Sequence, residues 1–245
     1  MIRPALILLL TAAAPAFAQA PAANTAVKII PDWSYQPLFD RAASVEKLFD
    51  EARVMDRSGD AIGRVENVIF SDSGEALAII ANINDLSGRG ETHVSIPWNE
   101  IGFSDEWEDV NVPIDADNIT EYTGFDPSGI VEKRDTASVG TVEGGDAMDL
   151  GEDVFQARDL IGDHAYLGDN NRWGYINDLV VRNGRLVAIV VEVADEQGSR
   201  HYAAPFDETA GVEPGDRRYT PPLNENAIET LGEFDYDRFR KRQSK

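Results

Sequence analysis

The chain has 245 residues, of which 44 are acidic and 22 are basic, and it contains no cysteine. The lack of cysteine excludes a disulfide framework, a lipoprotein anchor and a thiol nucleophile. The negative charge excludes nucleic acid as a partner for the body of the protein. A hydrophobic core must therefore stabilise the fold, and the length suffices for two ordinary domains.

The first residues predict export. Arg3 precedes the apolar run "ALILLLTAAA", and Ala16 and Ala18 provide the small-x-small spacing of a secretory cleavage site. We expect a signal peptide at residues 1–18, cleavage near Ala18 and a mature protein in the periplasm or outside the cell. We expect no membrane span after cleavage, and residues 19–44 should form an extended lead.

Two apolar hairpins resemble each other along the chain. The segment "GRVENVIFS" at residues 63–71 matches "GYINDLVVR" at residues 174–182, with apolar positions retained although few residues are identical. The first turn, Asp72 to Gly74, is longer than the second, Asn183-Gly184. Asn-Gly is the preferred two-residue hairpin loop, and a three-residue loop that ends in a left-handed Gly is the next commonest. The difference in length is confined to the turn, so we expect the strands on either side of it to present the same faces in both copies.

Further matching positions follow each hairpin in the same order. The segment "HVSIPWNE" from His93 matches "HYAAPFDE" from His201, and a later pair of segments begins at Pro113 and Pro222. The matching positions lie 108 to 111 residues apart. Near-constant spacing indicates a duplicated domain.

Each copy follows a short segment with helical spacing of its apolar residues. We expect a first domain at residues 45–125, a linker rich in Gly and Asp at 126–154, a second domain at 155–236 and a basic tail at 237–245. Each copy contains two long strands, shorter strands on either side and turn residues between them. This pattern predicts a mainly β protein with two tandem small β-barrels and short helical leads. The run "LVAIVVEV" requires cover on both faces of its strand.

The segment "DLIGDHAYLGDNNRWGYINDLVV" at residues 159–181 resembles the PRC-barrel domain, and residues 52–125 are a looser match. The resemblance covers an "LIGxxAY" lead, a strand of the form G-x-[VI]-x-[ND]-[VL], a Gly turn, a second apolar strand and a Pro-aromatic step. It implies an interaction module, as in the cytoplasmic tail of the photosynthetic reaction-centre H subunit and in a ribosome-maturation factor. It implies no catalytic residues and no cofactor.

The sequence contains no common catalytic motif. His93 and His201 occupy equivalent positions, which favours a structural role over a shared metal site, and His164 is expected to be an ordinary histidine. Acidic loops at residues 104–109, 115–118 and 144–153 leave open a calcium-responsive envelope protein, although none has the EF-hand spacing. A hydrolase with a site between the domains is a weaker alternative, and we expect neither a catalytic site nor a metal site.

Aromatic residues outside the barrel pattern are the candidate contacts, since Trp and Tyr dominate interface energetics. They are Trp107, in a run of acidic residues, together with Trp33, Tyr35 and Tyr236. The paired Trp98 and Phe206 are expected in the core. The sequence therefore predicts an exported, non-enzymatic adaptor or scaffold that binds a protein partner in the cell envelope.

Overall fold

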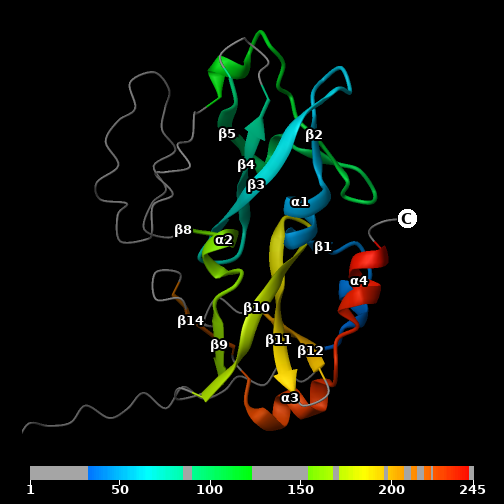
Figure 1. Ribbon diagram of the computed structural model, residues 1–245, viewed down its shortest axis with the longest axis vertical. Coiled ribbons are helices and arrows are strands. Elements are labelled where there is room, and N and C mark those ends of the chain that lie inside the picture. Colours follow the sequence, from blue (N-terminus) through cyan, green and yellow to red (C-terminus); the bar gives the residue numbers. More distant parts are fainter. Residues whose placement is uncertain are drawn as a thin grey trace, which may run out of the picture.

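The computed structural model describes residues 33–84, 90–122, 154–167, 171–195, 198–206, 211–213, 218–221 and 223–242. The predicted signal peptide and the linker predicted at 126–154, up to residue 153, lie outside the described residues. Two curled sheets follow one another along the long axis of the molecule, with α1 and α2 at the level where they meet (Figure 1). The mainly β architecture with two small barrels is thus confirmed.

The two sheets have the same strand order. The first runs β5-β4-β3-β2-β7-β6 with β8 on β3, and the second runs β12-β11-β10-β9-β14-β13 with β1 on β10. Each sheet has one parallel pair of strands at the same place in this order. It is β2 with β7 in the first sheet and β9 with β14 in the second. The strands of the first sheet are β2 (Arg53–Met55), β3 (Ala61–Ser71), β4 (Ala76–Ile83), β5 (Thr92–Pro97), β6 (Gly102–Phe103), β7 (Asp109–Asn111) and β8 (Val154–Gln156).

The second sheet carries the longer hairpin, β10 and β11. Its strands are β1 (Ala43–Ser44), β9 (His164–Leu167), β10 (Asn171–Arg182), β11 (Arg185–Asp195), β12 (Gly198–Pro205), β13 (Gly211–Glu213) and β14 (Arg218–Thr220). The hairpin turn has positive φ at both Asn183 and Gly184, and the first hairpin has a left-handed Gly74. Both turn predictions are confirmed.

The short segments that precede the two barrels, which we call the leads, are exchanged between the copies. Strand β1 precedes the first barrel in sequence but pairs with β10 of the second, and β8 precedes the second barrel but pairs with β3 of the first. The turns also meet: the amide of Ala76 donates to Gly184 O at 2.9 Å, and that of Leu186 donates to Gly74 O at 2.7 Å. Each barrel is therefore completed by the lead of the other copy.

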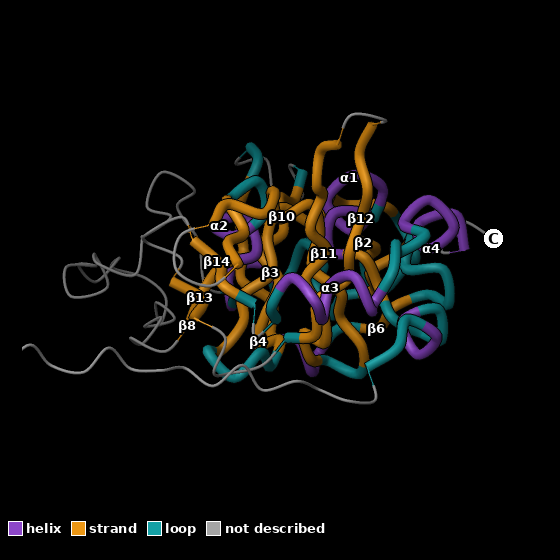
Figure 2. The backbone as a smooth tube through the Cα atoms, turned by 90° about the horizontal axis from the view of Figure 1, so that it is seen from below, coloured by secondary structure: helices purple, strands orange, loops and turns teal. Residues whose placement is uncertain are grey.

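In the part of the chain that the structure describes, four helices cover the sheets. They are α1 (Val45–Glu51), α2 (Ala157–Leu160), α3 (Glu225–Leu231) and α4 (Tyr236–Arg242), with 3-10 turns η1 (Gln36–Leu38), η2 (Trp98–Glu100) and η3 (Ile119–Glu121). Seen from below, α3 lies in front of the strands (Figure 2), and its Ile228 packs with Leu167 and Ala204 of the second sheet. One continuous cluster of buried residues includes Ile79 and Ile96 of the first barrel and Leu179 and Ile189 of the second.

The outer face of the β10–β11 hairpin is covered as well. Val180, Ala188 and Val190 are fully buried, and they pack with Phe239 of α4 and with Leu38 of η1. The inner face of β11 is buried by Ile189 in the shared core. Both faces of "LVAIVVEV" are thus covered, as its composition predicts.

Candidate functional site

Trp33 and Tyr35 fasten the segment before η1 to the second barrel. The indole Nε1 of Trp33 donates to Ala203 O on β12 at 3.0 Å, and the Tyr35 hydroxyl donates to Gly232 O at 2.9 Å. The Tyr35 ring also meets Phe234 edge-on, with centroids 5.1 Å apart. These contacts fix two of the predicted contact aromatics beside α3.

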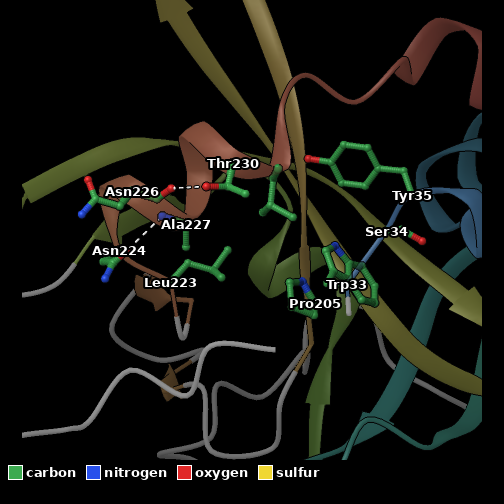
Figure 3. A pocket seen from close by; sticks show the side chains of 10 residues that line it. Trp33, Ser34, Tyr35, Pro205, Leu223, Asn224, Asn226, Ala227 and Thr230 are labelled. Atoms are coloured by element: carbon green, nitrogen blue, oxygen red, sulfur yellow. Dashed lines mark hydrogen bonds between the residues drawn. The ribbon is translucent and has the colours of Figure 1, made fainter. Parts of the chain in front are cut away.

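A groove of about 450 Å³ lies between this segment, the end of β12 and α3. Its walls are largely apolar: Trp33 stands beside Pro205, and Leu223 and Ala227 lie across from them (Figure 3). The groove is thus bordered by an indole, a proline and aliphatic side chains from three elements far apart in sequence. We call it the Trp33 groove.

The polar groups of the Trp33 groove are neutral. Asn224 caps α3, its side-chain oxygen accepting from the Ala227 amide at 2.9 Å, and Thr230 donates to Asn226 O at 2.8 Å. Burial raises the pKa of Tyr35 to about 12, so its hydroxyl stays protonated. None of the described residues that line the groove is charged. An apolar wall with a few amide groups suits an uncharged ligand segment.

Comparison with known families decides what the two barrels are. The family model of the PRC-barrel domain matches the chain twice, at residues 49–120 and 152–221, which together make up more than half of its length. The chain belongs to the PRC-barrel family. No curated protein is similar enough to the chain to count as a match. The Trp33 groove is bordered by elements of the second PRC barrel and by a segment that precedes both matches.

Trp107 lies in the first PRC barrel. It is half-buried with a positive φ of 59°, and its ring lies 4.2 Å from that of Phe103, which in turn lies 4.9 Å from Trp98. The three rings pack against the shared core. Trp107 is therefore part of an aromatic stack, whereas the sequence suggested a residue outside the core.

Tyr236 is placed differently from its prediction as an exposed contact. Only 7% of it is exposed, and its hydroxyl donates to Asp178 Oδ2 at 3.1 Å. The position follows from α4, which lays its aromatic face on the outer surface of β10. The ring of Tyr236 is thus not available to a partner.

Asp178 is fully buried and connects three elements. Its Oδ1 accepts from the amides of Leu179 at 2.8 Å and of Glu46 at 2.9 Å, the latter in α1. Burial raises its pKa to about 6, although hydrogen bonds, including one from Ser44, act in the opposite direction. Sequence reasoning missed this residue. The signal was present, because Asn67 and Asp178 occupy matching positions, and each directly precedes an apolar run of its strand.

The histidines and acidic loops make local contacts. His93 Nε2 lies 2.9 Å from Glu66 Oε2, the His201 ring stacks on Tyr236, and the His164 ring meets Tyr175. Asp115 Oδ1 accepts the amides of its own loop. Among the residues that the structure describes, no group of three or more His, Asp or Glu side chains could hold a metal. The acidic loop predicted at 144–153 lies outside those residues.

Proposed function

We propose that this PRC-barrel protein is an exported, non-enzymatic adaptor of the cell envelope. The export pattern of residues 1–18 supports the location, and the duplicated barrels support a role in bringing proteins together. Within the described part of the chain, no helix is long and apolar enough to cross a bilayer. The Trp33 groove is the observation that carries the proposal.

The chemistry of the groove favours an extended, uncharged segment of a partner protein. An indole and a proline side by side offer a flat apolar surface, and the amides of Asn224 and Asn226 offer hydrogen bonds to a peptide backbone. A strongly charged ligand would lose hydration without gaining an ion pair there. Among the described residues that line the groove, no nucleophilic side chain has a base beside it, which supports a binding role.

Partner capture with groove variants tests this function. The mature chain is immobilised and exposed to envelope extract, alongside Trp33→Ala and Asn226→Glu variants. Trp33→Ala removes the apolar wall, and Asn226→Glu places a charge in the neutral groove from an exposed position of α3. We expect each change to lower capture of the bound protein by about tenfold, the effect of losing an interface anchor.

The matched control is Trp107→Ala, which removes an indole from the aromatic stack and leaves the groove intact. Melting curves of all three variants identify any loss of folded protein. Capture that is equal for the Trp33→Ala, Asn226→Glu and unaltered chains, or that falls only with Trp107→Ala, would exclude the groove as the binding surface.

A further inference from the structure

The exchange of leads produces two equivalent corners in the molecule. In the first, Asn67 Oδ1 accepts from the amides of Val68 at 2.9 Å and of Arg158 at 3.2 Å. In the second, Asp178 Oδ1 accepts from the amides of Leu179 and Glu46 in the same manner. Arg158 in α2 and Glu46 in α1 therefore occupy matching positions, one at each corner.

The first corner holds a guanidinium group from the chain itself. Arg158 Nε donates to the backbone carbonyl of Glu66, the residue at the β3 bulge, and its guanidinium carbon lies 4.5 Å from the centroid of the Phe49 ring. A carbonyl acceptor and a flat apolar surface are the features that recognise a guanidinium group. In this corner the guanidinium group comes from the chain itself.

The second corner contains a cavity of about 360 Å³ instead. Glu46 stands there in place of Arg158, Ile161 in place of Phe49, and Asn177 at the bulge in place of Glu66. The strand opposite carries Glu192, which pairs with Tyr175 as Asn82 pairs with Arg64 in the first barrel. The matching changes put a carboxylate, Glu46, at the position that Arg158 has in the first corner, and Glu192 places a second carboxylate at the same cavity.

The electrostatics of this corner favour a cation. Burial raises the pKa of Glu46, and Asp50 adds to this effect, whereas the more distant charges of Arg158 and Arg240 act in the opposite direction. Within the described part of the chain, neither Glu46 nor Glu192 forms a salt bridge. Tyr175 borders the cavity with 47% of its surface exposed. The Tyr175 ring already stacks one guanidinium, that of Arg172, at 4.4 Å.

We propose that the second corner binds a guanidinium group supplied from outside the chain, as Arg158 supplies one to the first corner. Glu46 and Glu192 neutralise its charge, Ile161 provides the apolar surface that Phe49 provides in the first corner, and the Asn177 carbonyl is the equivalent of the acceptor at Glu66. The site is separate from the Trp33 groove and does not depend on the function proposed for it.

Titration with a matched pair of peptides tests the site. One is a blocked, otherwise neutral pentapeptide with a single central arginine. The other carries citrulline in its place, which has nearly the same shape without the charge. Agmatine, a small guanidinium compound, is titrated separately. Amide chemical shifts of the isotope-labelled full chain report binding. We expect saturable shifts around Tyr175, Asn177 and Glu192 with the arginine peptide, with a Kd on the order of 1 mM, and at least tenfold weaker binding of citrulline.

Two variants make the result specific. Glu46→Arg should supply the guanidinium internally and abolish binding, and Glu192→Gln should weaken it severalfold without adding a side chain to the cavity. Glu229→Gln, on exposed α3, is the control for loss of one negative charge. Tighter binding of the peptide than of agmatine identifies a protein side chain as the ligand, whereas the reverse identifies a small guanidinium compound. Equal shifts with arginine and citrulline, or unchanged binding by both corner variants, would overturn the proposal.

Discussion

Asp178 and Asn67 perform the same task with different side chains. Each turns one oxygen toward two backbone amides, one from its own strand and one from the helix of the other copy. Asn67 does so as a neutral amide, and its nitrogen donates to Gln156 Oε1 at 2.7 Å. Asp178 must hold a charge in a fully buried position to do so at neutral pH.

Replacing Asp178 by asparagine should therefore remove a pH dependence of stability. The folded-state pKa of Asp178, about 6, lies above the ordinary value of 3.8, so the folded state binds this proton more tightly. The group stabilises the fold most below pH 4, and the effect is lost as pH rises through 6. About two pH units correspond to about 3 kcal/mol. We expect Asp178→Asn to raise the free energy of unfolding at pH 7 by up to that amount, as measured by urea denaturation.

Asn67→Asp provides the opposite change at the matching position. It should introduce the same loss of stability between pH 4 and pH 7, because a second carboxyl group would then be buried among the same kind of amide donors. The prediction fails if Asp178→Asn destabilises the protein more at pH 7 than at pH 4.5.

At the scale of elements, the duplicated hairpins share a bulge and a close backbone approach. The register shifts between Val65 and Asn67 in β3 and between Ile176 and Asp178 in β10. A Cβ atom at Gly63 would lie 2.1 Å from Asn82 O, and one at Gly174 would lie 2.3 Å from Glu192 O. Only glycine allows the partner strand to approach this closely, so both copies retain it for a steric reason.

Gly174→Ala should destabilise the second hairpin. The added methyl group meets backbone on the paired strand, which cannot move without breaking the ladder, and we expect a loss of about 3 kcal/mol or more. Thermal unfolding measures it. Gly102→Ala is the matched control, because a Cβ atom there has no neighbour closer than 3.7 Å. Equal melting temperatures for the two variants would contradict the steric explanation.

The long elements could be predicted from the sequence, and the short ones could not be placed. Hairpin periodicity and turn residues identify β3, β4, β10 and β11, and they also account for the duplication. Strand β1 has two residues and β8 has three, too few to show a period. Their apolar residues would fit either barrel, because both barrels present the same pattern, so sequence alone cannot choose between a local and an exchanged partner.

The residues of the candidate sites could likewise be predicted only in part from the sequence. Trp33 and Tyr35 stand out in the sequence as aromatics outside the barrel pattern, and they border the groove. Tyr236 stands out for the same reason but is buried, because α4 folds back onto β10. Glu46 and Glu192 lie more than 140 positions apart, and only the exchange of leads brings them to one cavity.

At the scale of the whole molecule, the two barrels are held together by contacts outside the linker. Strands β1 and β8 each cross to the other sheet, the hairpin turns pair, and Arg240 of α4 lies 3.0 Å from Asp50 of α1. A shared core continues through both barrels. We therefore expect the copies to stay associated without covalent continuity through the linker.

Cutting the linker should leave one stable particle. A specific protease site placed at Gly144-Gly145 allows cleavage after folding. We expect the two fragments to elute together on a sizing column at micromolar concentration and to unfold in one transition, because each fragment carries a strand of the sheet of the other. Separation of the fragments in native buffer would show that the exchanged strands contribute little to association.

The exchanged leads also determine when folding can be completed. The helix α1 begins against the carboxylate of Asp178, 132 positions further along the chain, and the first sheet does not have its β8 strand until residue 156 has emerged. Such long loops must close, at a cost in chain entropy, before the contacts that compensate for this cost can form. Folding is therefore expected to be slow. A chain that emerges from its amino end thus cannot complete its first barrel and wait for the second. Both are completed in the same late step, and until then the end of β3 that pairs with β8 remains open.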